Sequence, residues 1–273
     1  MTTDAAAAGT ALACPPEFVA LAERLADAAG EVARRYFRTP IAVDTKPDNS
    51  PVTVADREAE AAMRAIIARE APRHGIYGEE MGKADIGAEF VWVLDPIDGT
   101  KAFITGKPSF GVLIALLRRG TPILGVIDQP ITRERWIGAA GRPTTLNGKP
   151  AHVRPCAALE QAVLYATAPE MFKGAEVAAW ENVRRRVKLA RYGADCYAYG
   201  LCALGFVDLV IEASLQPYDY CALVPVIEGA GGVMSDWQGG RLGLASGGQA
   251  LAAGDARMHA AAAKVLSGVH VGG

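Results

Sequence analysis

The chain has few of the residues that build disulfide scaffolds or zinc centres. Its 273 residues include only five Cys and four His. The Cys are odd in number and form no Cys-x-x-Cys pair, and the His are not spaced as ligands on one helix. Scattered Cys of this kind are typical of reduced thiols in a cytoplasmic protein. We therefore expect a cytoplasmic location and neither a disulfide framework nor a zinc site.

Long apolar runs and a strong net charge are also missing. No apolar run approaches the roughly 20 residues that a membrane span requires. The Ala-rich start lacks the basic residues that begin a signal peptide. The formal net charge is −2, so no overall field attracts nucleic acid or an anionic membrane. We expect a small-molecule partner, and neither nucleic acid nor a membrane.

Apolar residues make up 51% of the chain, enough for a sizeable core. Their spacing predicts helices over 17–37, 54–70, 176–187, 195–204, 220–229 and 258–266. Shorter apolar runs predict strands over 76–80, 90–94, 110–117, 123–128, 135–139, 162–166 and 207–212. Residues 1–15 are expected to form a mobile tail, and 44–51 a turn-rich loop. Pro225 conflicts with a regular helix over 220–229.

This mixture of consecutive strands and helices predicts an α+β fold. No linker divides the chain, but its composition changes near 147–155. We expect one compact catalytic unit with two parts, an N-terminal α+β half over 16–150 and a C-terminal α/β half over 151–268.

The most informative segment is the run from Trp92 to Thr100, in which an apolar stretch ends in Asp95 and Asp98. The stretch 90–94 is typical of a buried strand, so both carboxylates should follow a core strand, where open α/β sheets bind their ligands. The amides of Gly99 and Thr100 could open a helix, and a helix start binds phosphate. The alternative is a turn with two solvated Asp and a helix cap.

Other acids stand at the predicted ends of short elements. They are Asp56, Glu79, Asp195 and Asp219. Each has an ordinary alternative as a helix cap or a solvated loop residue. Together they form a donor set of oxygen atoms without His or Cys, which suits Mg²⁺. Crowded carboxylates repel one another unless cations neutralise them. Acids of this kind beside a phosphate-binding loop indicate a metal-dependent phosphatase.

Three segments in this order resemble the inositol-monophosphatase superfamily of Mg²⁺-dependent, lithium-sensitive phosphatases. They are Gly78-Glu79-Glu80, the run from Trp92 to Thr100, and Pro217-Tyr218-Asp219 with Glu228 to Gly232 downstream. The resemblance covers about residues 44–240. It implies an α/β/α/β/α layered sandwich, commonly a homodimer, with two or three Mg²⁺ ions in each site.

The resemblance also implies roles for individual residues. Glu79, Asp95 and the Ile97 carbonyl would hold one metal ion, and Asp95, Asp98 and Asp219 a second. Glu79 would reach a third through water. Thr100, paired with Asp56, would help activate the attacking water, and the amides of Gly99 and Thr100 would bind phosphate. Lys46, in a loop that is often catalytic in this family, is either near the site or an ordinary surface residue.

Within the superfamily, the segments from Ile104 to Pro108 and from Tyr192 to Tyr199 resemble histidinol-phosphate phosphatases. This implies that Gly193, Ala194, Asp195 and Glu212 bind substrate. L-histidinol phosphate carries an ammonium group and an imidazole, which acidic side chains recognise by charge-assisted hydrogen bonds. The resemblance therefore favours hydrolysis of L-histidinol phosphate to L-histidinol and phosphate, a step of histidine biosynthesis.

Four alternatives stay open at this point. The substrate could be inositol 1-phosphate, or a 3′(2′),5′-bisphosphate nucleotide. The chain could instead be a regulatory protein that binds a phosphate ligand without catalysis. Asp195 could cap the helix that follows it and have no part in substrate binding.

Overall fold

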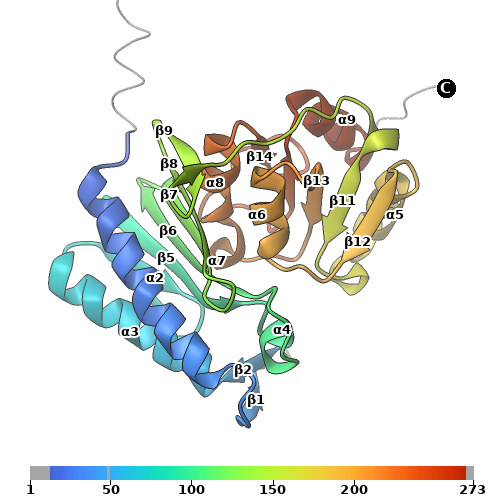
Figure 1. Cartoon of the computed structure of the whole chain (residues 1–273). Helices are drawn as coiled ribbons and strands as arrows, with labels where there is room; N and C mark the ends of the chain where they lie inside the picture. Colours follow the sequence, from blue (N-terminus) through green and yellow to red (C-terminus); the bar gives the residue numbers. More distant parts are fainter. Residues whose placement is uncertain (1–12, 48–49, 269–273) are drawn as a thin grey trace, which may run out of the picture.

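The computed structural model describes residues 13–47 and 50–268 (Figure 1). Most of the tail expected over 1–15 lies outside the described residues. Its last part is packed rather than free, because Cys14 is 3% exposed and its backbone N–H donates to the Ala140 carbonyl over 3.1 Å.

Two long helices, α2 (Pro16–Tyr36) and α3 (Val54–Glu70), lie side by side on one face of a large sheet (Figure 1). Their positions confirm the helices predicted over 17–37 and 54–70. Leu21 and Leu25 of α2 and Met63 and Ile67 of α3 are buried, since helical periodicity places them on the faces that meet each other and the sheet.

The large sheet has eight strands in the order β10-β9-β8-β7-β6-β5-β3-β4. All neighbours are antiparallel except β3 and β5, which are parallel. Its strands are β3 (Gly75–Gly78), β4 (Gly82–Ala84), β5 (Phe90–Asp98), β6 (Gly111–Arg118), β7 (Thr121–Gln129), β8 (Glu134–Ala139), β9 (Arg142–Leu146) and β10 (Lys149–Pro150). Strands β5 to β8 lie where strands were predicted over 90–94, 110–117, 123–128 and 135–139, whereas β4, β9 and β10 were not predicted. Strands β1 (Val43–Thr45) and β2 (Pro51–Thr53) pair antiparallel as a separate ribbon, so both ends of the loop predicted over 44–51 are in strands.

Strand β5 is longer than predicted. The expected end at Leu94 is wrong, because the strand continues to Asp98 and pairs with β6 as far as Gly111. The pairing is irregular between Asp95 and Asp98. A proline is tolerated at such an irregularity because the ladder needs no N–H there, which explains how Pro96 stays within the strand. Both carboxylates therefore sit on the irregular end of a core strand.

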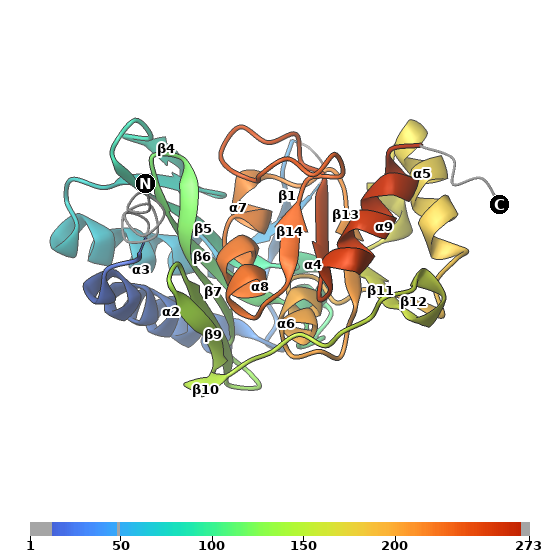
Figure 2. The same cartoon turned by 90° about the horizontal axis from the view of Figure 1, so that it is seen from above.

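The second sheet has five strands in the order β12-β11-β13-β15-β14. They are β11 (Val163–Ala166), β12 (Leu189–Tyr192), β13 (Leu209–Glu212), β14 (Val233–Ser235) and β15 (Ala250–Ala253). Of these, β11 and β13 were predicted. Helices α5 (Ala175–Arg184) and α9 (Ala256–Leu266) cover its outer face, and α6 (Tyr197–Ala203) and α8 (Leu223–Gly229) fill the space between the two sheets (Figures 1 and 2). The result is the predicted α/β/α/β/α sandwich.

The helix predicted over 220–229 is wrong as one element, because it is split into α7 (Pro217–Tyr220) and α8. Pro225 is the third residue of α8, a position whose N–H has no acceptor within the helix, so the ring costs no hydrogen bond. Short elements complete the chain: α4 (Thr100–Ile104), η1 (Leu159–Gln161) and η2 (Pro169–Met171). Helix α4 begins where the Gly-Thr pair predicted a helix start.

Candidate active site

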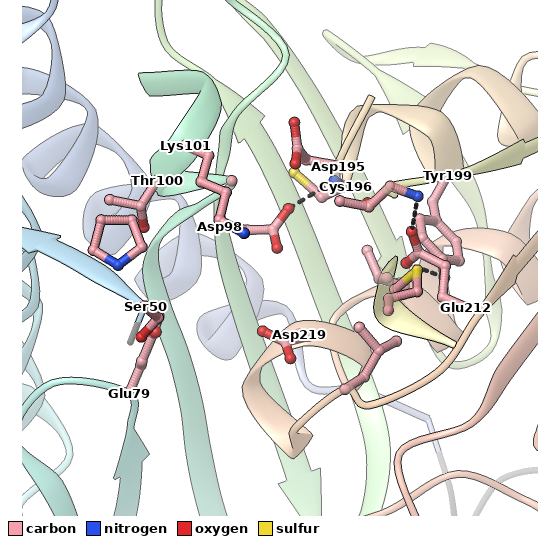
Figure 3. Close-up of a pocket in the computed structure, with 16 residues that line it drawn as sticks. Ser50, Glu79, Asp98, Thr100, Lys101, Asp195, Cys196, Tyr199, Glu212 and Asp219 are labelled. Carbon is pink, nitrogen blue, oxygen red and sulfur yellow. Dashed lines mark hydrogen bonds between the residues drawn. The ribbon is translucent and has the colours of Figure 1, made fainter. Parts of the chain in front are cut away.

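A cavity of about 200 Å³ lies where β5, α4, α6, α7 and β13 converge (Figure 3). Seven of the residues singled out in the sequence line it. They are Glu79, Asp98, Gly99, Thr100, Asp195, Glu212 and Asp219. Asp56, Asp95 and Ile97 are at most 1% exposed. Gly193 and Ala194 are not among the lining residues; the Gly193 N–H instead donates to the carbonyls of Ala166 and Thr167 and so shapes the turn before α6.

Three carboxylates form a cluster at this cavity, of which Asp98 and Asp219 line it and Asp95 is buried beside them. One oxygen each of Asp95, Asp98 and Asp219 lies within 4.8 Å of the others. Burial, followed by the charges of neighbouring carboxylates, raises the pKa of Asp95 and Asp98 well above the ordinary range. Burial likewise raises the pKa of Asp219 to about 7. A buried group of this kind favours a cation that neutralises it, and its oxygen donors fit Mg²⁺.

Local backbone contacts orient the cluster. Asp219 is in a capping box, where its Oδ2 accepts the Gln216 N–H over 2.6 Å. Asp95 Oδ1 accepts the Ile97 N–H over 3.0 Å, and the Ile97 carbonyl accepts the Thr100 hydroxyl over 3.2 Å. These bonds fix the carboxylates before any ligand binds.

Glu79 follows β3 at the edge of the same cavity. Its N–H donates to the Leu94 carbonyl over 3.1 Å, and its carboxylate lies 2.7 Å from the ammonium group of Lys46. Lys46 also contacts Glu80 over 2.6 Å. Burial lowers the pKa of Lys46, but hydrogen bonds to the two carboxylates outweigh it and raise that pKa. Lys46 is therefore near the site rather than on open surface.

Thr100 and Asp56 are in contact through their side chains. The Thr100 hydroxyl lies 3.4 Å from Asp56 Oδ1. Asp56 is fully buried, and its Oδ2 accepts both the N–H and the hydroxyl of Thr53, over 2.8 and 2.6 Å. Asp56 thus serves as part of a helix cap and also contacts Thr100, which lines the cavity. Burial raises its pKa.

Asp195 is packed against the Gly-Thr turn. A Cβ built on Gly99 would lie 2.7 Å from Asp195 Cγ, so the contact requires glycine. Asp195 has a positive φ of 48°, and its Oδ2 accepts the Ser109 hydroxyl over 3.0 Å. The N-cap residue of α6 is Cys196, so the alternative in which Asp195 caps that helix is wrong.

Glu212 ends β13 on the far side of the cavity from Glu79 (Figure 3). It is 4% exposed, and its two oxygens accept the Thr167 N–H over 2.8 Å and the Tyr199 hydroxyl over 2.9 Å. Burial raises the pKa of Glu212 to about 7, although both hydrogen bonds oppose the shift.

Sequence reasoning missed Ser109, Thr167 and Tyr199 as hydrogen-bond partners of Asp195 and Glu212. Ser109 and Asp195 are 86 residues apart, and Thr167 and Glu212 are 45 apart. No periodicity or motif spacing reports such contacts, so only the fold reveals them.

Comparison with known proteins places the chain in a family. Residues 15–270 match the inositol monophosphatase family. The chain belongs to this family. It is therefore a member of a phosphatase family of hydrolases, as the motif resemblance implied.

Relatives and solved structures extend this result. The chloroplastic bifunctional phosphatase IMPL2 of Arabidopsis thaliana is 54% identical over 258 residues, which cover 91% of this chain and 75% of that protein. A histidinol-phosphatase of Chlorobaculum parvum is 35% identical over 221 residues, 80% of this chain and 85% of the relative. An inositol monophosphatase structure from Zymomonas mobilis has a TM-score of 0.85 and 48% identity, covering 92% of this chain and 98% of the other. Among the described residues, no helix is long and apolar enough to cross a membrane.

Proposed function

We propose that this protein is a Mg²⁺-dependent phosphomonoesterase that hydrolyses L-histidinol phosphate to L-histidinol and phosphate in histidine biosynthesis. The observation that carries the proposal is that two separate groups of acidic residues lie at one cavity. Asp95, Asp98 and Asp219 form a metal-type cluster, whereas Asp195 and Glu212 line the cavity outside that cluster.

The metal-binding part follows from the donor set. Asp95, Asp98 and Asp219 would hold Mg²⁺, with Glu79 and the Ile97 carbonyl as further ligands. Bound Mg²⁺ would neutralise phosphate oxygens, lower the pKa of the attacking water and stabilise the leaving oxygen. The raised pKa values of the three Asp support this assignment, because binding a cation offsets the cost of burying their charges.

The remaining catalytic groups belong to the Gly-Thr turn. Thr100 donates its hydroxyl hydrogen toward Asp56 or the Ile97 carbonyl, so its oxygen can accept a hydrogen bond from the attacking water. The buried Asp56 carboxylate, with its raised pKa, then draws the proton through the hydroxyl. The N–H groups of Gly99 and Thr100 stand at the start of α4, where no intrahelical acceptor exists, and donate to phosphate oxygens.

We assign recognition of the L-histidinol part of the substrate to Asp195 and Glu212. The Ser109 hydroxyl holds Asp195 in place through Oδ2. An ammonium or imidazolium group beside Asp195 would form a charge-assisted hydrogen bond that an uncharged alcohol cannot match. Glu212, held by Thr167 and Tyr199, would bind the second nitrogen-bearing group. The relatives named histidinol-phosphatase support this substrate.

Inositol 1-phosphate is the second candidate. The observation in its favour is the 48% identity to an inositol monophosphatase of known structure. Its hydroxyl groups can donate to Asp195 and Glu212, but without a full positive charge. We also propose a homodimer in the cytoplasm, on the strength of the family resemblance and the sequence composition.

A side-by-side assay tests the substrate. Phosphate release is measured with Mg²⁺ for histidinol phosphate, inositol 1-phosphate and 3′-phosphoadenosine 5′-phosphate. We expect kcat/KM for histidinol phosphate to exceed the others by about 100-fold, because each charge-assisted hydrogen bond contributes about 1.5–3 kcal/mol. Preference for either other substrate would reject the assignment of Asp195 and Glu212 but leave the metal chemistry standing. A lack of turnover on all three would favour the non-catalytic alternative.

A further inference from the structure

Glu60 is a fully buried carboxylate on α3 whose partners lie in the turn after β3. Its Oε2 accepts the Glu80 N–H over 2.7 Å. Its Oε1 accepts the Met81 N–H over 3.1 Å and the Arg64 Nε–H over 2.7 Å. Buried charges persist in proteins when they are paired and hydrogen-bonded, and these donors meet that requirement. The side chain therefore ties helix α3 to two consecutive amides of this turn.

The end of β3 is built around the same carboxylate. A Cβ on Gly78 would lie 2.0 Å from Glu60 Oε1 and 2.4 Å from its Cδ. No side chain fits at that position without moving Glu60. The last residue of the strand is thus in van der Waals contact with the carboxylate that also binds the turn, so the strand end and the turn have one shared anchor.

Glu79 lies between these two contacts. On one side Gly78 packs on Glu60, and on the other Glu80 donates its N–H to it. The N–H of Glu79 itself donates to the Leu94 carbonyl of β5, next to Asp95. The backbone of Glu79 is consequently held between α3 and β5, and its distance from the acidic cluster is set by both.

We propose that Glu60 is a positioning residue that fixes the Glu79 carboxylate for metal binding. The inference rests on the proposed function, in which Glu79 is a metal ligand. Glu60 does not reach the cavity, and acts only through the Gly78–Met81 backbone. Arg64 supports it from one helical turn away through their ion pair.

The test is Glu60→Gln, measured by metal binding. Gln keeps the shape but replaces one acceptor oxygen by an NH₂ group, which then faces an N–H donor and displaces the turn. Mn²⁺, which binds oxygen ligands as Mg²⁺ does, is titrated into EDTA-treated protein, and the free ion is read by electron paramagnetic resonance. We expect the Kd to rise by about 10- to 100-fold, as for other partners that orient metal ligands.

A matched control lies on the same helix. Glu58 contacts Tyr36 and Arg35 on the outer side, so Glu58→Gln removes a charge of α3 without touching the turn and should leave the Mn²⁺ Kd unchanged. If Glu60→Gln lowers the Tm but binds Mn²⁺ with the wild-type Kd below that Tm, Glu60 is only structural and the inference is overturned. Should Glu60→Gln fail to fold, Glu60→Asp keeps the charge but is too short to reach both amides. A wild-type Mn²⁺ Kd in Glu60→Asp likewise overturns the inference.

Glu79→Gln separates this inference from the proposed function. A weaker Mn²⁺ Kd in Glu79→Gln supports the ligand assignment, and Glu60→Gln then tests the positioning role alone. An unchanged Kd in Glu79→Gln overturns the ligand assignment and with it the premise of the inference. An unchanged Kd in Glu60→Gln alone overturns only the role of Glu60.

Discussion

The backbone N–H of Cys196 donates a hydrogen bond to Oδ2 of Asp98 over 2.6 Å (Figure 3). The two residues are 98 positions apart, at the start of α6 and the end of β5. The bond therefore joins the acidic cluster to the turn that carries Asp195. The charge of Asp195 also contributes to the raised pKa of Asp98, so the acidic cluster and Asp195 share one electrostatic environment.

We predict that Asp98→Asn stabilises the metal-free protein while it abolishes most activity. Burial and the nearby charges of Asp195 and Asp219 raise the pKa of Asp98, so its ionised form is unfavourable without a cation. Removing that charge should raise the Tm in EDTA by about 2–4 °C for each kcal/mol gained. Phosphate release should fall by about 100-fold or more, because a metal site supplies several kcal/mol of transition-state stabilisation.

Asp27→Asn is the control for this experiment, since Asp27 pairs with Arg135 at the surface and its side chain is 71% exposed. It should change neither the Tm nor the rate. Added Mg²⁺ should raise the Tm of the wild type more than that of Asp98→Asn. An Asp98→Asn variant that is less stable in EDTA and still active would contradict both parts of the prediction.

Asp195→Asn should separate charged from uncharged substrates. Loss of the carboxylate removes a charge-assisted hydrogen bond worth about 1.5–3 kcal/mol, so KM for histidinol phosphate should rise by about 10- to 100-fold. KM for β-glycerophosphate, whose alcohol has no cation, should change little. Initial rates of phosphate release over a range of each substrate provide both values.

Ser109→Ala refines this prediction. Ser109→Ala leaves the charge of Asp195 but removes the hydroxyl that holds its Oδ2. The KM for histidinol phosphate should therefore rise by a smaller factor than in Asp195→Asn. Equal losses on both substrates in Asp195→Asn would mean that Asp195 supports the site as a whole and does not recognise the cation.

The elements of the fold that could be predicted from the sequence are those with a local pattern of apolar residues. The helices on the outer face of the large sheet and the strands β5 to β8 follow from apolar spacing, because each buries one stripe or face. The acids were found because Asp95 and Asp98 are adjacent to a buried strand and a Gly-Thr pair. Local patterns therefore predicted Asp95 and Asp98 and much of the scaffold that carries them, whereas Glu212 was predicted only from the family resemblance.

The features that could not be predicted depend on contacts between residues far apart in the sequence. The continuation of β5 past Leu94 is decided by pairing with β6, whose irregular register accommodates Pro96. The contacts of Glu60 with the turn after β3 and of Ser109 with Asp195 join segments that only folding brings together. Short edge strands such as β12 and β14 carry too few residues for a periodic signal.

Gly99→Ala should displace Asp195 from the turn. Gly99 has φ 83°, where a Cβ costs about 1–2 kcal/mol. In addition, that Cβ would lie 2.7 Å from Asp195 Cγ, so the carboxylate must move. We expect kcat/KM for histidinol phosphate to fall by about tenfold or more, the loss expected when one charge-assisted hydrogen bond is broken.

Gly120→Ala isolates the backbone cost. Gly120 has φ 80°, but a Cβ there meets nothing within 4 Å. It should lower the free energy of unfolding by about as much as the strain at Gly99, about 1–2 kcal/mol, without changing substrate preference. Urea unfolding of both variants measures the cost in free energy of unfolding, and the substrate assay measures the change in kcat/KM. Equal activity in the two variants would show that the contact between Gly99 and Asp195 has no part in recognition.

Glu212 should make the metal-free protein less stable as the pH rises toward neutrality. Burial raises its pKa in the folded state from 4.5 to about 7. Below about pH 4.5 the Glu212 carboxyl is protonated in both the folded and the unfolded chain. Its contribution to the free energy of unfolding is then at its maximum. Between about pH 4.5 and 7 the unfolded chain releases the proton while the folded chain retains it, so the free energy of unfolding falls.

The comparison with Glu212→Gln measures this contribution together with the effect of the Glu212 charge on the pKa of Asp219, because the other titrating groups are common to both proteins. Gln is neutral at all pH values, so the difference in free energy of unfolding, wild type minus variant, should decrease from about pH 4.5 to about pH 8 by an amount on the order of 3 kcal/mol. Urea unfolding in EDTA at several pH values measures it. A difference that stays constant across this range would place the pKa of Glu212 near its ordinary value. In that case Glu212 would be ionised at neutral pH in the folded state and would need a bound cation beside it.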